Sequence, residues 1–220
     1  MGRLMNVMTP LHKRAARDYL GRMRDDKPKC MTVAKLYDAD YWDGDRRYGY
    51  GGYHYDGRWK PVAEQLIEEY GLNERSSILD VGCGKAYLLY ELHKLLPTAR
   101  LAGFDIAEYA IGESMTEIRE KLFVHRAEDP YPYKDDEFDL VISLTTLHNL
   151  DIFDLKTALM EIERVGKNKY IVCESYRNDL DLFNLQCWAL TCKSFFSSAA
   201  WQWIFEEFVY TGDYEFIYFE

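Results

Sequence analysis

The sequence lacks the features that membrane-embedded and disulfide-stabilised proteins need. No apolar stretch in its 220 residues approaches the roughly 20 that a transmembrane helix requires, and its amino terminus has no signal-peptide pattern. Its five cysteines are odd in number and scattered along the chain, which is typical of reduced thiols. Cys187 and Cys192 lack a second pair of ligands, so we expect no metal site. Together these absences predict a cytoplasmic protein without a membrane span.

Positive charge is also scarce, with 27 Lys and Arg residues against 37 Asp and Glu and a net charge of −10. A nucleic-acid partner is disfavoured, because contacts to phosphates need a basic surface. An anionic membrane surface is disfavoured for the same reason. The chain has no internal repeat, and its hydrophobic fraction of 48% is enough for a sizeable core. Length and composition therefore fit one catalytic domain with a cap.

The most informative segment is residues 76–86, which read Ser-Ser-Ile-Leu-Asp-Val-Gly-Cys-Gly-Lys-Ala. A short apolar run ends in Asp80 and two glycines, Gly82 and Gly84, and a helical pattern follows. This order predicts a strand, a tight turn and the start of a helix, where α/β sheets bind small cofactors. The glycines let the backbone approach a ligand closely. The carboxylate of Asp80 would repel a pyrophosphate but suits an ammonium group.

The same segment argues against a dinucleotide. The dinucleotide fingerprint needs a third small residue three places after the second glycine, where the helix packs close to the strand. That place holds Tyr87, a bulky ring. An oxidoreductase that binds NAD therefore becomes an alternative, to be distinguished by which cofactor the protein binds.

The spacing Asp-x-Gly-x-Gly of residues 80–84 resembles motif I of the class I S-adenosylmethionine-dependent methyltransferases. That family usually has a third glycine where Ala86 stands. Residues 100–106 are expected to form the second strand, which ends in Asp105, an acid placed to accept hydrogen bonds from ribose hydroxyls. The resemblance implies S-adenosyl-L-methionine as the cofactor, with Asp105 on both ribose hydroxyls and Ile106 against the adenine.

Later segments agree with this resemblance in order and spacing. Residues 138–144, which end in Leu144, form a near-continuous apolar run typical of a strand buried on both faces, and they resemble motif IV. Residues 169–174 form another such run, which ends in Glu174. We assign Leu144 to the cofactor site.

The segment after the third expected strand, residues 122–124, departs from the family. The family often has an acid there that hydrogen-bonds the adenine amino group, but this position holds Arg126, a donor that cannot accept. Glu128 or Asp129, slightly further on, is assigned to that role instead.

The resemblance covers roughly residues 60–175 and implies a Rossmann-like α/β fold. We expect a seven-stranded mixed sheet with helices on both faces, preceded by an N-terminal cap of helices and an aromatic loop. Residues 1–60 are assigned to this cap and lid, and residues 61–220 to the domain that binds the cofactor. Further helices are expected at 60–70, 86–95, 107–119 and 153–165, and from Ser197 or Ser198 to residue 208. The last strand is expected at 213–219.

Two helices are expected inside the cap, at residues 10–23 and 28–37. The first is basic, and we interpret its charges as a solvated face, with a membrane or an acidic partner as the alternative. The basic residues are Lys13, Arg14, Arg17, Arg22 and Arg24.

The second informative segment, residues 40–59, is the aromatic loop: it is dense in rings, glycines and charge and has neither helical nor strand periodicity. Long loops of this kind often bind ligands or cover them. We expect its tyrosines to stack on a sugar ring or to shield the sulfonium, namely Tyr48, Tyr50, Tyr53 and Tyr55. We expect its arginines to pair with a substrate phosphate or with the cofactor carboxylate, namely Arg46, Arg47 and Arg58. Arg58 is the preferred partner of the carboxylate.

Methyl transfer is an in-line displacement, in which positioning alone can contribute about 7–11 kcal/mol. A hydroxyl acceptor also needs a general base. His148, just after the fourth expected strand, is our first candidate, and His54 in the aromatic loop is the alternative. Glu174 and Tyr176 are expected to orient the acceptor, and Arg177 to meet an anionic group.

The sequence therefore predicts an S-adenosylmethionine-dependent methyltransferase acting on a small molecule. The chain is similar to enzymes of bacterial surface-polysaccharide and nucleotide-sugar pathways, which implies a sugar or nucleotide-sugar acceptor. Two alternatives stay open: a non-catalytic module that binds the cofactor or a partner, and a protein methyltransferase. A homodimer is one of the oligomeric states compatible with the sequence.

Overall fold

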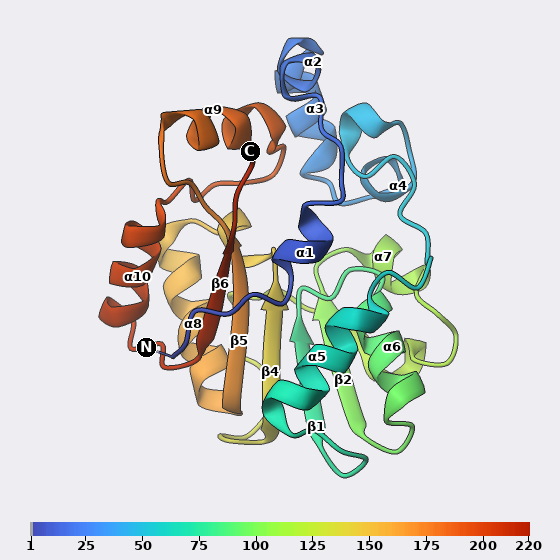
Figure 1. Ribbon diagram of the computed structural model, residues 1–220. Coiled ribbons are helices and arrows are strands. Elements are labelled where there is room, and N and C mark those ends of the chain that lie inside the picture. The colour runs from blue at the N-terminus through green and yellow to red at the C-terminus, as the bar shows by residue number, and fades with distance from the viewer. Residues whose placement is uncertain (1) are drawn as a thin grey trace.

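A parallel six-stranded sheet organises residues 2–220, the part of the chain that the computed structural model describes (Figure 1). Its strands follow the sheet order β3-β2-β1-β4-β5-β6, and every neighbouring pair is parallel. They are β1 (Ser77–Val81), β2 (Arg100–Asp105), β3 (Leu122–Val124), β4 (Phe138–Leu144), β5 (Gly166–Glu174) and β6 (Asp213–Ile217). The strand order reverses between β1 and β4, so a ligand crevice is expected at the carboxyl ends of these two strands.

The expectation of seven strands of mixed direction is wrong. After β5 the chain forms α9 (Asp179–Trp188) and α10 (Ser198–Glu207) and returns to the sheet once, as β6. The outer edge of β6 is met by the first described residues: the amide of Met5 donates to Tyr214 O at 2.8 Å, and the amide of Tyr214 donates to Arg3 O at 3.0 Å. This segment covers backbone groups that a sheet edge would otherwise expose.

A buried carboxylate fixes the segment that follows. Glu215 of β6 accepts hydrogen bonds from the amides of Val7, Met8 and Thr9 at 2.6, 3.0 and 2.6 Å, and from the hydroxyl of Tyr170 at 2.5 Å. Such charge-assisted bonds compensate a carboxylate for the loss of water. They hold the start of α1 (Thr9–His12) beside the sheet.

The remaining helices confirm some expected positions closely. The helix expected at 60–70 is α5 (Lys60–Tyr70), and those expected at 86–95 and 153–165 are α6 (Tyr87–Leu95) and α8 (Ile152–Val165). Ser197 caps α10 by accepting from the amide of Ala200 at 3.2 Å, as expected. The helix expected at 107–119 is shorter, because α7 (Glu108–Gly112) ends where the Ser114 hydroxyl binds the carbonyl of Ile111.

The basic helix expected at residues 10–23 is interrupted. It is divided into α1 and α2 (Tyr19–Arg24), with non-helical backbone between them. Arg17 turns back and donates to the carbonyls of His12 and Ala15, and Asp18 caps the second helix by accepting from Gly21 N at 2.8 Å. These local bonds compete with helix propagation.

The segment from residue 19, where α2 begins, to residue 48 lies beyond the carboxyl ends of the strands (Figure 1). It contains α3 (Lys27–Ala34), α4 (Ala39–Trp42) and the 3-10 helix η1 (Arg46–Tyr48), and two further 3-10 helices follow later, η2 (Arg119–Lys121) and η3 (Leu147–Asn149). The aromatic loop thus contains α4 and η1, which its sequence did not predict. The division of the chain at residue 60 stays a prediction.

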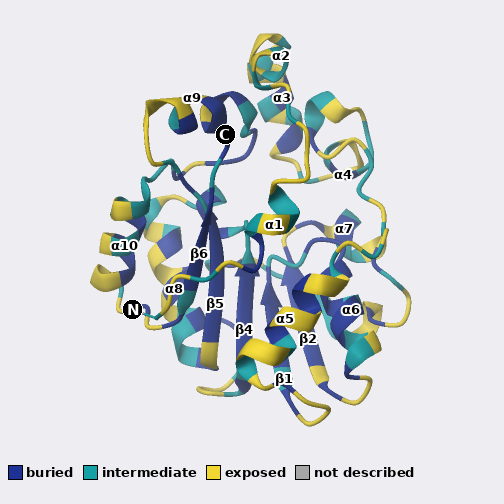
Figure 2. Ribbon diagram, viewed as in Figure 1, coloured by how far each residue is buried: buried dark blue, intermediate teal, exposed yellow. Residues whose placement is uncertain are grey.

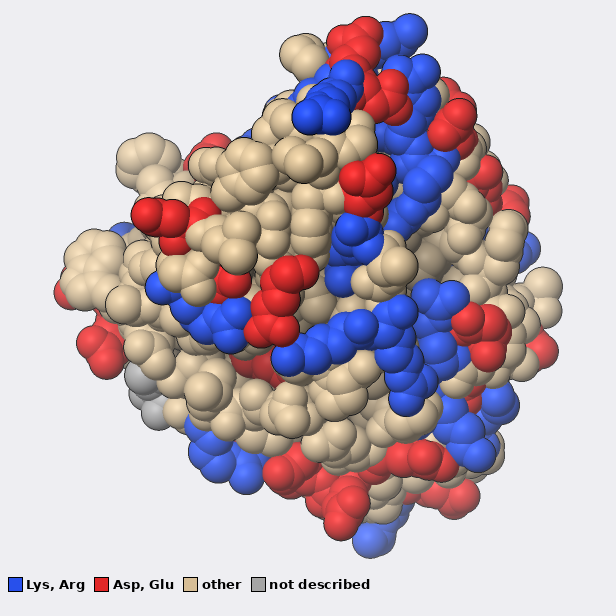
Figure 3. Space-filling model, turned by 45° about the horizontal axis from the view of Figure 1, so that its top comes forward, with Lys and Arg blue, Asp and Glu red and all other residues tan. Residues whose placement is uncertain are grey.

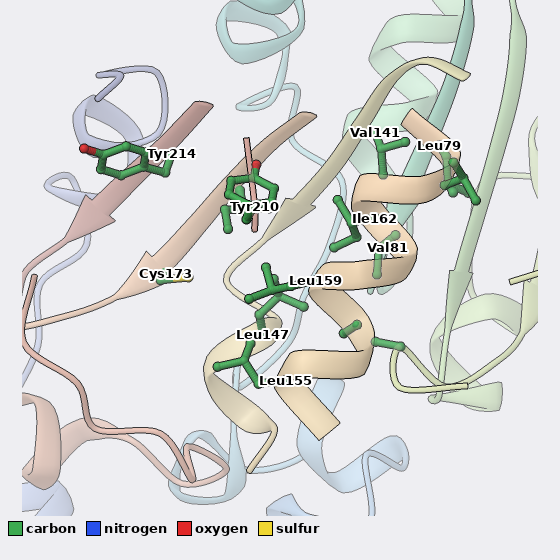
Figure 4. Close-up of a cluster of buried hydrophobic side chains, with 14 of the residues drawn as sticks. Leu79, Val81, Val141, Leu147, Leu155, Leu159, Ile162, Cys173, Tyr210 and Tyr214 are labelled. Carbon is green, nitrogen blue, oxygen red and sulfur yellow. The ribbon is translucent and has the colours of Figure 1, made fainter. Parts of the chain in front are cut away.

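Alternate residues of each central strand point to opposite faces of the sheet and build two hydrophobic clusters. Leu79 and Val81 of β1 pack with α8 and α10, whereas Ile78 packs with α5 and α6. Figure 4 shows the first cluster, with Leu155, Leu159 and Ile162 of α8 labelled near β1 and β4. In Figure 2 the central strands are dark blue, which means buried. This explains the near-continuous apolar runs of the sequence.

Within residues 2–220, the cysteines are all free thiols. No helix in that part of the chain is long and apolar enough to span a bilayer.

Candidate functional site

The turn after β1 requires glycine at two positions. Gly82 has a φ of +77°, and a Cβ built on it would lie 2.3 Å from the Thr146 side chain. Gly84 has a φ of +55°, and a Cβ there would lie 2.6 Å from the ring of Trp42. Both positions therefore combine a left-handed backbone with close packing. Ala86 has a φ of +56°, a left-handed backbone conformation that favours glycine.

Two buried carboxylates lie at the ends of the first two strands. The carboxylate of Asp105 accepts from the amides of Gly84 and Ala107, both at 2.8 Å. Asp80 is only 4% exposed, and burial, together with the nearby Asp105, raises its pKa to about 8. Among residues 2–220 no Lys or Arg is paired with either carboxylate. This pair is suited to an ammonium group and to hydroxyl donors.

A cavity of about 310 Å³ opens beside Asp105. Several predicted cofactor residues line it, namely Gly82, Asp105, Ile106, Glu128 and Leu144. Ile106 is 43% exposed, an apolar surface suited to a flat ring. Arg126 donates a hydrogen bond to Glu128, and both side chains face this cavity, whereas Asp129 does not line it. We call this space the cofactor cavity.

A larger cavity of about 790 Å³ adjoins the first. The two share five lining residues, namely Tyr41, Tyr50, Thr145, Asn149 and Thr191. Of these, Thr145 has a φ of +54°, which is strained for a β-branched residue, and its amide donates to Val172 O at 2.9 Å. The strain lies at the boundary between the two cavities. We call the larger space the substrate cavity.

His148 and Glu174 meet in the wall of the substrate cavity. His148 Nε2 lies 3.3 Å from Glu174 Oε2, and both residues line the cavity. Burial lowers the pKa of His148, and the negative charge of Glu174 opposes this shift. The Nδ1 of His148 has no partner in the described part of the chain. The pair therefore has the arrangement of a base with an orienting acid.

Ring stacking and an ion pair hold the aromatic loop together and against the turn after β1. The rings of Trp42 and Tyr50 stack with centroids 5.2 Å apart, and those of Tyr53 and Tyr87 at 5.1 Å. Lys85, which follows Gly84, lies with its Nζ 2.6 Å from the carboxylate of Asp43. Tyr87, which argued against a dinucleotide in the sequence, is thus a platform for the aromatic loop.

Not every predicted residue reaches a cavity. His54 is exposed, and Tyr48 packs against the buried cluster of Cys30, Ala34 and Leu190 and beneath the cation of Arg47. Both lie outside the two described cavities, and so do Tyr176 and Arg177. His54 is therefore poorly placed as a base.

Two predicted arginine contacts are replaced by ion pairs. Arg177 is bound to Asp181 at 2.7 Å and to Glu220 at 2.8 Å, so its positive charge is already neutralised. Arg58 lines the substrate cavity instead of the cofactor cavity, and its guanidinium pairs with Asp56 at 2.5 Å. The structure therefore gives no support to Arg58 as the partner of the cofactor carboxylate. Tyr50 and Tyr53 do line the substrate cavity, and their contacts with a substrate stay a prediction.

Several residues of the substrate cavity were not predicted from the sequence. Trp188 comes from the end of α9, and His12, Arg17 and Arg22 come from the basic segment that we interpreted as a solvated face. The available signal was the concentration of arginines before residue 25 in an acidic chain.

A family model described as a methyltransferase domain matches residues 72–209, more than half of the chain. Among curated proteins, the mitochondrial arginine-hydroxylase NDUFAF5 of Mus musculus is 30% identical over 109 residues, which cover 50% of this chain and 31% of that protein. The malonyl-[acyl-carrier protein] O-methyltransferase of Bacillus anthracis is 30% identical over 108 residues, which cover 47% of this chain and 39% of that protein. The chain thus matches well under half the length of these curated relatives.

Among solved structures, a geranyl diphosphate C-methyltransferase from Streptomyces coelicolor superposes with a TM-score of 0.54 at 14% identity. The match covers 71% of this chain and 66% of that one, and that structure contains Mg²⁺, geranyl diphosphate and S-adenosyl-L-homocysteine. At this identity the likeness concerns the fold.

Proposed function

Because this chain belongs to the class I S-adenosylmethionine-dependent methyltransferases, with S-adenosylmethionine as its cofactor, we propose that it methylates a small molecule in the substrate cavity. One observation carries the proposal: the cofactor cavity, with Asp105, and the substrate cavity, with His148, meet at Thr145. A donor bound on one side of this boundary would adjoin an acceptor bound on the other, as in-line transfer requires.

The residues at the end of the first strands fit this cofactor. We assign the ribose hydroxyls to Asp105, the ammonium group to Asp80 and the adenine to Ile106, Leu144 and Glu128. Both carboxylates are buried without a Lys or Arg partner in the described residues, which supports the first two assignments, since a cation and two hydroxyl donors would compensate their burial. When bound, the cofactor supplies a methyl group that is activated by positive sulfur.

His148 and Glu174 are proposed to prepare the acceptor. The contact between His148 Nε2 and Glu174 favours the tautomer whose proton is on Nε2, which leaves the buried Nδ1 unprotonated and without a partner in the described residues. We assign to this nitrogen the acceptance of a proton from a substrate hydroxyl that reaches it. Because burial lowers the pKa of His148, the ring is neutral and basic at pH 7. The rings of Tyr41, Tyr50 and Tyr53 line the cavity and limit the access of water.

We propose a sugar or nucleotide-sugar as the acceptor. The tyrosine rings of the aromatic loop support this choice, since such rings stack on the apolar faces of sugars, and a cavity of about 790 Å³ fits a small molecule. The likeness to an arginine-hydroxylase over half of the chain makes hydroxylation of a protein side chain the second candidate. Mass spectrometry of the product distinguishes the two, because one reaction adds a methylene group and the other adds an oxygen atom.

Calorimetry with S-adenosylmethionine tests the cofactor site. We expect micromolar binding, and Asp105→Ala should weaken it at least tenfold, because the ribose hydroxyls lose their acceptor. Glu108→Gln is a matched control, since Glu108 is exposed and lies three residues further along the chain. Unchanged affinity in Asp105→Ala would reject the ribose assignment.

A further inference from the structure

Three arginines surround one indole ring in the substrate cavity. The guanidinium carbons of Arg22, Arg46 and Arg17 lie 4.2, 5.0 and 5.6 Å from the ring centroid of Trp188. They come from α2, from η1 and from the segment between α1 and α2, so the cluster forms only when these segments fold together. In Figure 3, which brings the top of the molecule forward, Lys and Arg side chains gather across the middle and the upper part of the visible surface.

None of these three guanidinium groups has a carboxylate within 4 Å anywhere in residues 2–220, whereas their neighbours Arg47 and Arg58 are paired with Asp25 and Asp56. Acidic side chains are in excess in this chain, so the missing partners do not reflect a shortage of acids. Within the described residues, this cluster therefore has no carboxylate in ion-pair contact.

Main-chain carbonyls hold the three side chains in place instead. Arg22 Nη2 donates to Arg46 O at 2.8 Å, Arg46 Nη1 donates to Gly49 O at 2.7 Å, and Arg17 Nη1 donates to Ala15 O at 3.1 Å. Arg17 Nε is buried and has no partner within the described residues. The guanidinium groups are thus positioned before any ligand binds, with donors still free.

Holding three like charges together is unfavourable without an anion. Burial lowers the pKa of Arg22 to about 10, with Arg46 adding to the effect, and burial also lowers the pKa of Arg17 and Arg46. All three stay protonated at pH 7, so the repulsion persists in the free protein. Glu174 near Arg17 and Asp25 near Arg22 contribute negative charge, and Asp56 and Arg58 of the cavity wall form an ion pair with each other. Arg14 adds a positive charge, and His12 is neutral at pH 7 because its pKa is lowered to about 4.

We propose that Arg17, Arg22 and Arg46 bind a phosphate or diphosphate group of the substrate, beside the face of Trp188. Forked donors that approach from three segments match an anion with several oxygens and more than one charge, whereas a single carboxylate has two oxygens and occupies one fork. The inference rests on the proposed function, since it places the anionic end of the acceptor in the cavity that also contains His148 and Glu174.

Calorimetry with inorganic pyrophosphate tests this site on the full chain. We expect the wild type to bind pyrophosphate, and Arg22→Met and Arg46→Met each to weaken binding at least tenfold. Arg24→Met is the matched control, because Arg24 is exposed on the same helix and lies outside both described cavities. It should change the affinity less than twofold. Succinate, a dicarboxylate probe, should bind at least tenfold more weakly than pyrophosphate.

Titration of S-adenosylmethionine into the same samples separates this inference from the proposed function. If the wild type binds the cofactor but not pyrophosphate, or if Arg22→Met and Arg24→Met lose affinity equally, the anion site is refuted and the proposed function stands. If the cofactor does not bind, the proposed function fails. Arg22→Lys keeps the positive charge and should retain more affinity than Arg22→Met. Arg46→Met provides the test if Arg22→Met does not fold.

Discussion

The carboxylate of Asp43 lies 2.6 Å from Lys85 Nζ, and this ion pair joins the aromatic loop to the turn that follows β1. The same carboxylate accepts from the hydroxyl of Tyr109 at 2.9 Å and from the amide of Tyr53 at 3.1 Å. The two partners differ in burial: the side chain of Lys85 is 2% exposed and that of Asp43 is 21% exposed. The loop is therefore attached through a cation that has almost no access to water.

This asymmetry predicts unequal effects of removing each partner. Asp43→Ala leaves a buried, unpaired ammonium group, so it should lower the free energy of unfolding by about 3–5 kcal/mol. Lys85→Met leaves a carboxylate that keeps two donors and some water, so about 1–2 kcal/mol should be lost. Urea denaturation measures both. Asp56→Ala, which breaks the exposed pair with Arg58, should cost about 1 kcal/mol or less. Equal losses at Asp43 and Lys85 would contradict the argument.

Gly82→Ala should be strongly destabilising. The new Cβ would lie 2.3 Å from the Thr146 side chain at a φ of +77°, so strain and overpacking together should cost at least about 2 kcal/mol. Affinity for S-adenosylmethionine should fall as well, because Gly82 lines the cofactor cavity. Gly112→Ala is the control, since a methyl group added there would meet no described atom within 4 Å and α7 tolerates alanine. Thermal unfolding of the two variants gives the comparison, and similar midpoints would be unexpected.

Binding of the cofactor should release protons. Burial raises the pKa of Asp80 to about 8, so this carboxyl is mostly protonated at pH 7, and a cationic ammonium favours its ionised form. Affinity should therefore increase as the pH rises toward 8 and then level off. Calorimetry in two buffers of different ionisation enthalpy measures the proton release, and Asp80→Asn should abolish it. A wild type that releases no protons would refute the assignment of Asp80.

The same shift affects the stability of the cofactor-free protein. The unfolded carboxyl ionises near pH 3.8 and the folded one near 8, so the folded state holds more protons between these values. The contribution of Asp80 to the free energy of unfolding therefore falls as the pH rises from about 3.8 to about 8. In Asp80→Asn this contribution should disappear.

The pH dependence of turnover should report His148. Burial lowers its pKa, so the acid limb of kcat should lie below pH 6.5. Glu174→Gln removes the charge that opposes this shift, and should move the limb to a still lower pH. His148→Asn should reduce turnover about 10²-fold or more while it leaves cofactor affinity intact. An acid limb that does not move in Glu174→Gln would argue against the pair.

The parts of the fold that were predicted correctly depend on local patterns. Residues 138–144 are buried on both faces, so their apolar run identified β4, and the glycines at 82 and 84 marked a turn whose backbone only they adopt readily. The prediction of one continuous helix at residues 10–23 was wrong, because hydrogen bonds from Arg17 to the carbonyls of His12 and Ala15 interrupt it. Amino-acid composition does not reveal such contacts.

The substrate cavity was less predictable because its wall is assembled from distant segments. Trp188 comes together with Arg22 and Arg46 although 166 and 142 positions separate them in the sequence, so no spacing rule joins them. By contrast, Arg177 and Asp181 are four residues apart, so their ion pair could have been predicted from the sequence. That ion pair argues against a role for Arg177 in substrate binding.

The hydrogen bonds of Glu215 join residues that are 206 to 208 positions apart, and they have a consequence for biosynthesis. While the ribosome is still translating, residues 7–9 have no anchor until β6 emerges, and long-range pairing of this kind slows folding. A nascent chain arrested before residue 213 already contains the turn after β1 with Asp80 and Asp105. It lacks β6 and the residues after it, which hold His12 in the wall of the substrate cavity. The substrate cavity should therefore form after the cofactor cavity during synthesis.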